Sequence, residues 1–102
     1  MVLTTTQNIE NFKIVDYLGI VTGVNFRMRE TLSFSDAFQQ KKHHEAFENS
    51  INTAKEEAFQ QLQENAKKLG ANAVVGIHVD FELTSQMSKI VVSITGTAVK
   101  VQ

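Results

Sequence analysis

A segment near the C-terminal end, Ala73–Leu83 (AVVGIHVDFEL), constrains the fold of this chain more than any other stretch. Apolar and polar side chains alternate along it, and this two-residue period is typical of a strand with one buried face. The residues that precede it, Lys68–Gly70, fit the end of a helix with glycine in a left-handed position. The side expected to be buried carries Val75, Ile77, Val79, Phe81 and Leu83. The opposite side carries His78, Asp80 and Glu82.

Three further segments have strand character. Val2–Thr6 is short and rich in β-branched residues, and Ile90–Val101 forms a final strand after a polar, hairpin-type connection. We expect a bulge at Gly96 in that last strand. Phe12–Phe26 carries apolar residues on both parities, which predicts burial on both faces, either by its own chain or by a neighbouring one. Within it, Gly19 and Gly23 indicate a bend, a bulge or a close backbone contact.

Residues 36–69 lie between these strands and are predicted to be helical. Their apolar stripe recurs at steps of three or four: Phe47, Ile51, Ala54, Ala58, Leu62, Ala66 and Leu69. The sequence leaves open whether they form one helix or two, and we expect a break near Lys41–Glu45, where the periodicity is weakest. The order predicts an α+β fold: a mostly antiparallel four-stranded sheet with one long helix, plus a possible short one, on one face.

The uncovered face of such a sheet keeps apolar positions, which indicate an interface and therefore a homo-oligomer. The residues expected there are Val15, Tyr17, Val21, Val91, Val99 and Val101.

The composition of the chain disfavours several classes of function. The chain has 102 residues, so residues 1–102 are expected to form a single domain. A net charge of -1 gives no field that would attract nucleic acid or an anionic membrane. With no cysteine, nucleophile motif or glycine-rich phosphate loop, we expect a protein that is not an enzyme. The start of the chain lacks a basic segment followed by an apolar run, which favours a cytoplasmic location.

Three segments, "YLGIVTG" (17–23), "LGANAVVGIHVDFE" (69–82) and "SITGTAVKV" (93–101), resemble the YbjQ-like family of small prokaryotic proteins, and the opening "LTTT" fits as well. These proteins are catalogued as heavy-metal-binding, and their cellular role is unknown. The resemblance implies an α+β fold assembled as a ring-like homo-oligomer, a pentamer in particular, without a demonstrated activity. The stretch 38–47 (FQQKKHHEAF) departs from the glycine-rich, arginine-containing loop of similar members. A binding role of that loop therefore does not carry over.

The candidate metal ligands are His78, Asp80 and Glu82, because one imidazole and two carboxylates can bind zinc, manganese or iron. Alternate residues of a strand lie roughly 7 Å apart, so we prefer a solvated sheet face or polar subunit contacts. His44 and Glu48 form a weaker two-ligand candidate next to His43, and a solvated helix start is preferred there too.

We therefore predict a non-enzymatic homo-oligomer without a cofactor. The alternative is a ring-shaped protein that binds a divalent metal or a small molecule at its subunit contacts. Soft heavy metals are disfavoured because they select thiolates, and the chain has no cysteine.

Overall fold

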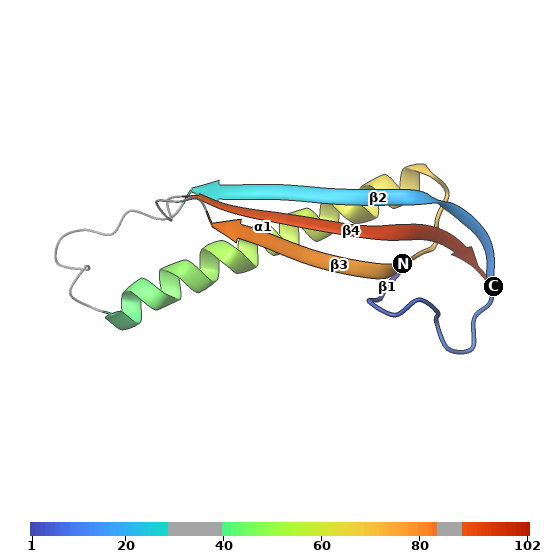
Figure 1. Ribbon diagram of the computed structural model, residues 1–102, viewed down its shortest axis with the longest axis horizontal. Helices are drawn as coiled ribbons and strands as arrows, with labels where there is room; N and C mark the ends of the chain where they lie inside the picture. The colour runs from blue at the N-terminus through green and yellow to red at the C-terminus, as the bar shows by residue number, and fades with distance from the viewer. Residues whose placement is uncertain (29–39, 84–88) are drawn as a thin grey trace.

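The computed structural model describes residues 1–28, 40–83 and 89–102, with residues 28 and 40–47 described by their backbone alone (Figure 1). The elements are β1 (Val2–Leu3), β2 (Ile14–Met28), α1 (Gln40–Lys68), β3 (Ala73–Leu83) and β4 (Lys89–Val101). One long helix lies against one face of a four-stranded sheet, which confirms the predicted α+β class. No helix in the described ranges is long and apolar enough to cross a membrane.

The sheet has the order β1-β3-β4-β2, with β4 antiparallel to both of its neighbours. The pair of β1 and β3 is parallel, so the sheet is mixed rather than purely antiparallel. Beyond β1 the N-terminal segment stays bonded to β3: the Thr4 amide donates to the Val74 carbonyl (3.0 Å), and the Gly76 amide donates to the Thr6 carbonyl (2.8 Å). This segment therefore covers the first half of the outer edge of β3.

Helix α1 is continuous from Gln40 to Lys68, so the break expected near residues 41–45 was wrong. The predicted start over residues 36–39 lies outside the described residues. The predicted apolar stripe is confirmed at its centre, where Ala54, Ala58, Leu62 and Ala66 are fully buried. Three of these four are alanines, and their small side chains let the helix lie close to the sheet.

The closest approach of helix and sheet is at Gly23 of β2. A Cβ atom there would lie 1.9 Å from the Ala58 carbonyl oxygen and 2.9 Å from the Leu62 amide nitrogen. Gly19 lies instead at a register shift of β2, with φ of 133°. Of the predicted alternatives, Gly23 is thus a close backbone contact, whereas Gly19 lies at an irregularity of the strand.

The turn after α1 follows the sequence closely. Gly70 has φ of 82°, its amide donates to the Lys67 carbonyl (2.9 Å), and the Ala71 amide donates to the Ala66 carbonyl (3.1 Å). This is the Schellman arrangement, which satisfies carbonyls at the helix end. The Asn72 side chain then accepts from the Val101 amide (2.8 Å) and donates to its carbonyl (3.0 Å), which ties the turn to β4.

The alternation of β3 is interrupted by a bulge. Gly76 has φ of 61°, and the register shifts between Val75 and His78. Val75 consequently lies on the face opposite to Ile77, so the expectation of an unbroken alternation was wrong. The bulge expected at Gly96 is on the neighbouring strand: two residues of β3 lie opposite Gly96, whose missing side chain leaves room for Ile77 (3.0 Å from a Cβ built there).

Two apolar clusters lie on opposite faces of the sheet. The larger one joins α1 to the sheet, and it includes Val21, which is 5% exposed. The smaller one consists of Ala73, Val75, Val99 and Val101, with Ile9 and Ile14 packed against it. Val21 was expected on the uncovered face, and this was wrong. The irregularities of β2 bring Tyr17 and Ile20 to the same face, which reverses the predicted parity of the following residues.

Candidate binding surface on the open sheet face

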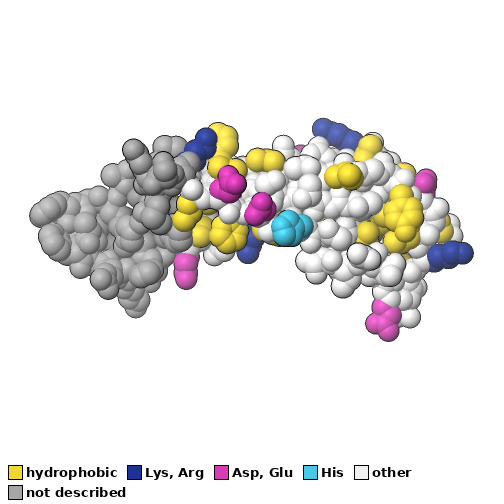
Figure 2. All heavy atoms as spheres, in the orientation of Figure 1, with side chains coloured by type: hydrophobic (Ala, Val, Ile, Leu, Met, Phe, Trp, Pro, Cys, Tyr) yellow, Lys and Arg dark blue, Asp and Glu magenta, His cyan; other side chains and the backbone are white. Residues whose placement is uncertain are grey.

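The side of the sheet that faces away from α1, called the open face below, carries different chemistry on each strand. The register pairs β2 residues with β4 residues and these with β3 residues in successive rows. The rows are Ile20–Thr97–Val75, Thr22–Thr95–His78, Val24–Ser93–Asp80 and Phe26–Val91–Glu82. The open face is therefore largely apolar along β2, mostly hydroxyl-bearing along β4 and polar along β3. Figure 2 shows a histidine side chain beside acidic ones in the middle of the molecule, with apolar side chains on both sides of them.

The β2 side of the open face is an exposed apolar stripe, formed by Tyr17, Ile20, Val24 and Phe26. Ile20 is 80% exposed, Tyr17 69% and Phe26 60%. The Lys89 ammonium lies 4.3 Å from the centroid of the Phe26 ring, within the range of a cation–π contact. Neighbouring large apolar side chains that remain exposed are typical of a protein interaction surface.

The polar row of β3 is the candidate metal site of the sequence analysis. The side chains of His78, Asp80 and Glu82 are exposed and follow one another at alternate positions on the open face. In the part of the chain that the structure describes, no group of three His, Cys, Asp or Glu side chains could hold a metal ion. Among the described residues, the row of a single chain is thus not gathered around one ion.

Part of the second metal candidate, His44 with Glu48, lies among side chains that are not described. His43 and His44 lie in the first turns of α1, but their side chains are among those of residues 40–47 that are not described. Glu48 is exposed on the same helix.

The free edge of β2 is partly covered by two amide side chains of α1. The Val24 amide donates to Gln61 Oε1 (2.8 Å), and Asn65 Nδ2 donates to the Thr22 carbonyl (2.8 Å). Sequence reasoning missed this role of Gln61 and Asn65. The available signal was a pair of carboxamides four residues apart, directly beside the buried stripe.

An ionic contact holds the helix at the far end of β2. Arg27 Nη2 lies 2.5 Å from Glu57 Oε1, and Asn25 Nδ2 donates to Glu57 Oε2 (2.8 Å). The Arg27 and Glu57 side chains are 40% and 43% exposed, so the pair contributes little to stability. Arg27 is therefore engaged within the chain rather than available to an anionic ligand.

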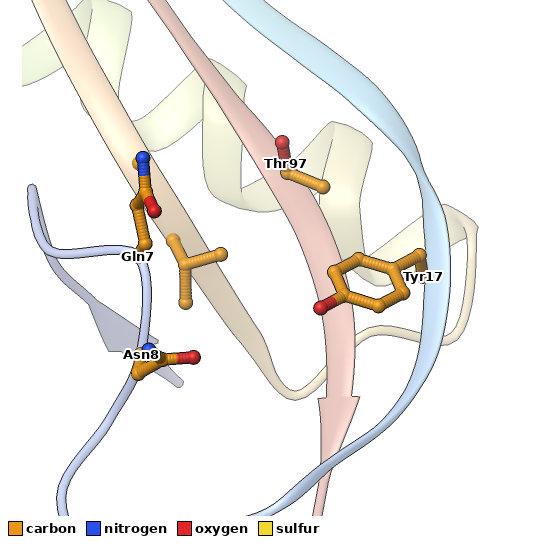
Figure 3. A pocket seen from close by; sticks show the side chains of 6 residues that line it. Gln7, Asn8, Tyr17 and Thr97 are labelled. Atoms are coloured by element: carbon orange, nitrogen blue, oxygen red, sulfur yellow. The ribbon is translucent and has the colours of Figure 1, made fainter.

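A cavity of about 400 Å³ lies at the other end of the open face (Figure 3). The N-terminal segment forms one wall with Gln7 and Asn8. Strands β2, β3 and β4 supply the rest: Tyr17, Val75, Gly76 and Thr97. None of these residues is charged. Sequence reasoning missed the cavity because it depends on the β3 bulge and on the path of residues 4–8 across the sheet.

Comparisons with known proteins agree with this architecture. A YbjQ family model described as "Putative heavy-metal-binding" matches residues 1–102. A UPF0145 protein from Carboxydothermus hydrogenoformans is 38% identical over 107 residues, which cover 100% of this chain and 97% of that protein. The crystal structure of a DUF74-family protein of unknown function from Pediococcus pentosaceus has a TM-score of 0.65 and 20% identity. That match covers 100% of this chain and 98% of the other, and it shows a common fold.

Proposed function

Since the chain belongs to the YbjQ-like family, for whose relatives no specific function is established, we propose that it acts as a non-enzymatic homo-oligomer assembled through the open face. The observation that carries the proposal is the part of the apolar stripe beyond Tyr17, namely Ile20, Val24 and Phe26, which are exposed in the single chain. We propose that a second copy of the chain covers these residues. A net charge of -1 produces little repulsion between copies, and each copy brings the same stripe to the contact.

The proposed assembly is a ring-shaped pentamer. Support for the number five comes from the resemblance to the family, and support for the contact comes from the exposed stripe. In a closed ring every copy occupies an equivalent environment, so Ile20, Val24 and Phe26 of every copy would be covered together. Burial of a side chain such as Ile20, which is 80% exposed, contributes about 1.5–3 kcal/mol when it is complete.

The test is the mass of the purified protein at micromolar concentration, measured by light scattering and native mass spectrometry. We expect a discrete oligomer, and we expect Ile20→Lys and Phe26→Lys to shift it toward the monomer, because each places a charge within the apolar stripe. Gln60→Lys is the matched control, since it makes the same charge change at an exposed position of α1. A monomeric wild-type protein, or wild-type mass in both stripe variants, would contradict the proposal.

A second candidate function is metal binding at the subunit contacts. It is favoured by the position of His78, Asp80 and Glu82 on the same open face, where an assembly could bring ligands from several copies together. These ligands suit zinc, manganese or iron, whereas soft heavy metals would require thiolates. Native mass spectrometry after exposure to zinc tests it: a metal retained in fixed ratio to the oligomer, and lost in His78→Gln, would support metal binding over assembly alone.

A further inference from the structure

The cavity beside the N-terminal segment is built by backbone bonds and not by chance contacts of flexible side chains. Besides the bonds of Thr4 and Thr6 to β3 given above, the Ile77 amide donates to the Thr4 carbonyl (3.1 Å). The Thr6 hydroxyl then donates to the Asn8 carbonyl (2.6 Å), so the turn is fixed on both sides of Gln7. A wall held in this way loses little conformational entropy when a ligand binds.

Four uncharged polar side-chain groups border the cavity. They are the carboxamides of Gln7 and Asn8 and the hydroxyls of Tyr17 and Thr97. Within the described part of the chain, none of these four side-chain groups makes a hydrogen bond. Figure 3 shows the Tyr17 hydroxyl and the Asn8 carboxamide oxygen pointing toward each other across the cavity. The apolar side chain of Val75, which is 4% exposed, also lines it. The site thus combines an apolar lining residue with solvent-accessible donors and acceptors that make no hydrogen bond within the described residues, and small-molecule sites commonly have both.

The lining selects a class of ligand. With no charged residue in it, a phosphate, carboxylate or ammonium group would find no counter-charge. A carboxamide offers one donor and one acceptor in a plane, and Asn and Gln pair with the donor and acceptor edge of a base through both. The Tyr17 ring is 69% exposed, and aromatic rings in such a position stack on bases. The volume of about 400 Å³ is in the lower part of the range for small-molecule sites.

We propose that this cavity binds an uncharged nucleobase or nucleoside, with the base against the Tyr17 ring and its polar edge bonded to Gln7 and Asn8. The six residues that line the cavity all belong to one chain, so the inference goes beyond the proposed assembly and does not depend on it. The hydroxyls of Tyr17 and Thr97 supply further hydrogen bonds to the ligand.

Isothermal titration of the intact protein with adenine, adenosine and ribose 5-phosphate tests the inference. We expect adenine and adenosine to bind with dissociation constants below about 1 mM, and ribose 5-phosphate to bind at least about tenfold more weakly because it lacks a base. No binding of adenine or adenosine up to about 5 mM, or equal binding of ribose 5-phosphate, would overturn the proposal.

Variants localise the binding. Gln7→Ala and Asn8→Ala should each weaken adenosine binding about three- to tenfold, the loss that corresponds to one or two hydrogen bonds. Tyr17→Leu should weaken it more than Tyr17→Phe, which keeps the ring. Gln60→Ala removes an exposed carboxamide from α1 and should leave binding unchanged.

The mass of each variant, measured in parallel, separates loss of ligand from loss of assembly. If Gln7→Ala and Asn8→Ala both bind adenosine like the wild type, the ligand does not occupy this cavity.

Discussion

Replacing Gly23 by alanine tests how closely α1 approaches the sheet. The new Cβ atom would lie 1.9 Å from the Ala58 carbonyl oxygen, where an ordinary contact needs more than 3 Å, so helix and strand must separate by about 1 Å or more. The obstructing atoms belong to the backbone, and no side-chain rotation can relieve them. Overpacking costs about 1–3 kcal/mol when side chains can adjust, and we expect at least the upper end of that range. At about 4–8 °C per kcal/mol, the midpoint should fall by roughly 12–24 °C.

Thermal and urea unfolding, followed by the helical circular dichroism signal, measure this effect. Thr22→Ala is the control, because it shortens an exposed side chain on the same strand and should change stability by about 0.5 kcal/mol or less. The double variant Gly23→Ala/Ala58→Gly should not recover stability, since the contact is with the Ala58 carbonyl and not with its methyl group. A loss below about 1 kcal/mol in Gly23→Ala, or full recovery in the double variant, would refute the backbone-contact argument.

Three further results are expected. Leu62→Ala should destabilise the fold by about 2–5 kcal/mol in the same assay because Leu62 is fully buried, whereas Leu69→Ala, at a site 45% exposed, should cost about 1 kcal/mol or less. Gln61→Ala should speed hydrogen exchange of the Val24 amide about fivefold, since that amide loses its acceptor; an unchanged rate would show that the bond does not protect it. His78→Gln should preserve the oligomer mass and change zinc affinity little by titration, and loss of a site tighter than about 1 μM would make His78 a ligand.

The elements that the sequence predicted well are those whose pattern is local. The helix end at Gly70 and the span Ala73–Leu83 have short-range causes, namely the left-handed glycine and the two-residue period. The faces of the strands were harder to predict. Bulges shift the parity of β2 and β3, and a bulge depends on pairing with a distant strand. Gly76 was the available signal in β3, but a glycine within a strand has several explanations.

The sequence predicted that the open face carries exposed apolar residues, but it did not predict which residues these are. Apolar residues left over after the helix covers one face follow from counting the faces of β2, so an exposed stripe was foreseen. Its members changed because Gly23 has to face α1, which sends Val24 and Phe26 to the other side. The cavity had no comparable signal, since Gln7 and Asn8 meet Thr97 only through the folded path of the N-terminal segment.

The carboxamides of Gln61 and Asn65, which cover the middle of β2, also affect whether copies of this protein can pair strand to strand at the edges of their sheets. A sheet can grow without limit by adding copies only if both of its edges can pair with an incoming strand, because each added copy must present a free edge to the next copy. Here an incoming strand at β2 would have to displace Gln61 from the Val24 amide and Asn65 from the Thr22 carbonyl before it could pair. At the opposite edge, the N-terminal segment covers β3 only as far as Ile77 within the described residues. We therefore expect strand addition at that single edge to end once two copies have paired, because the two carboxamides of α1 oppose pairing at β2.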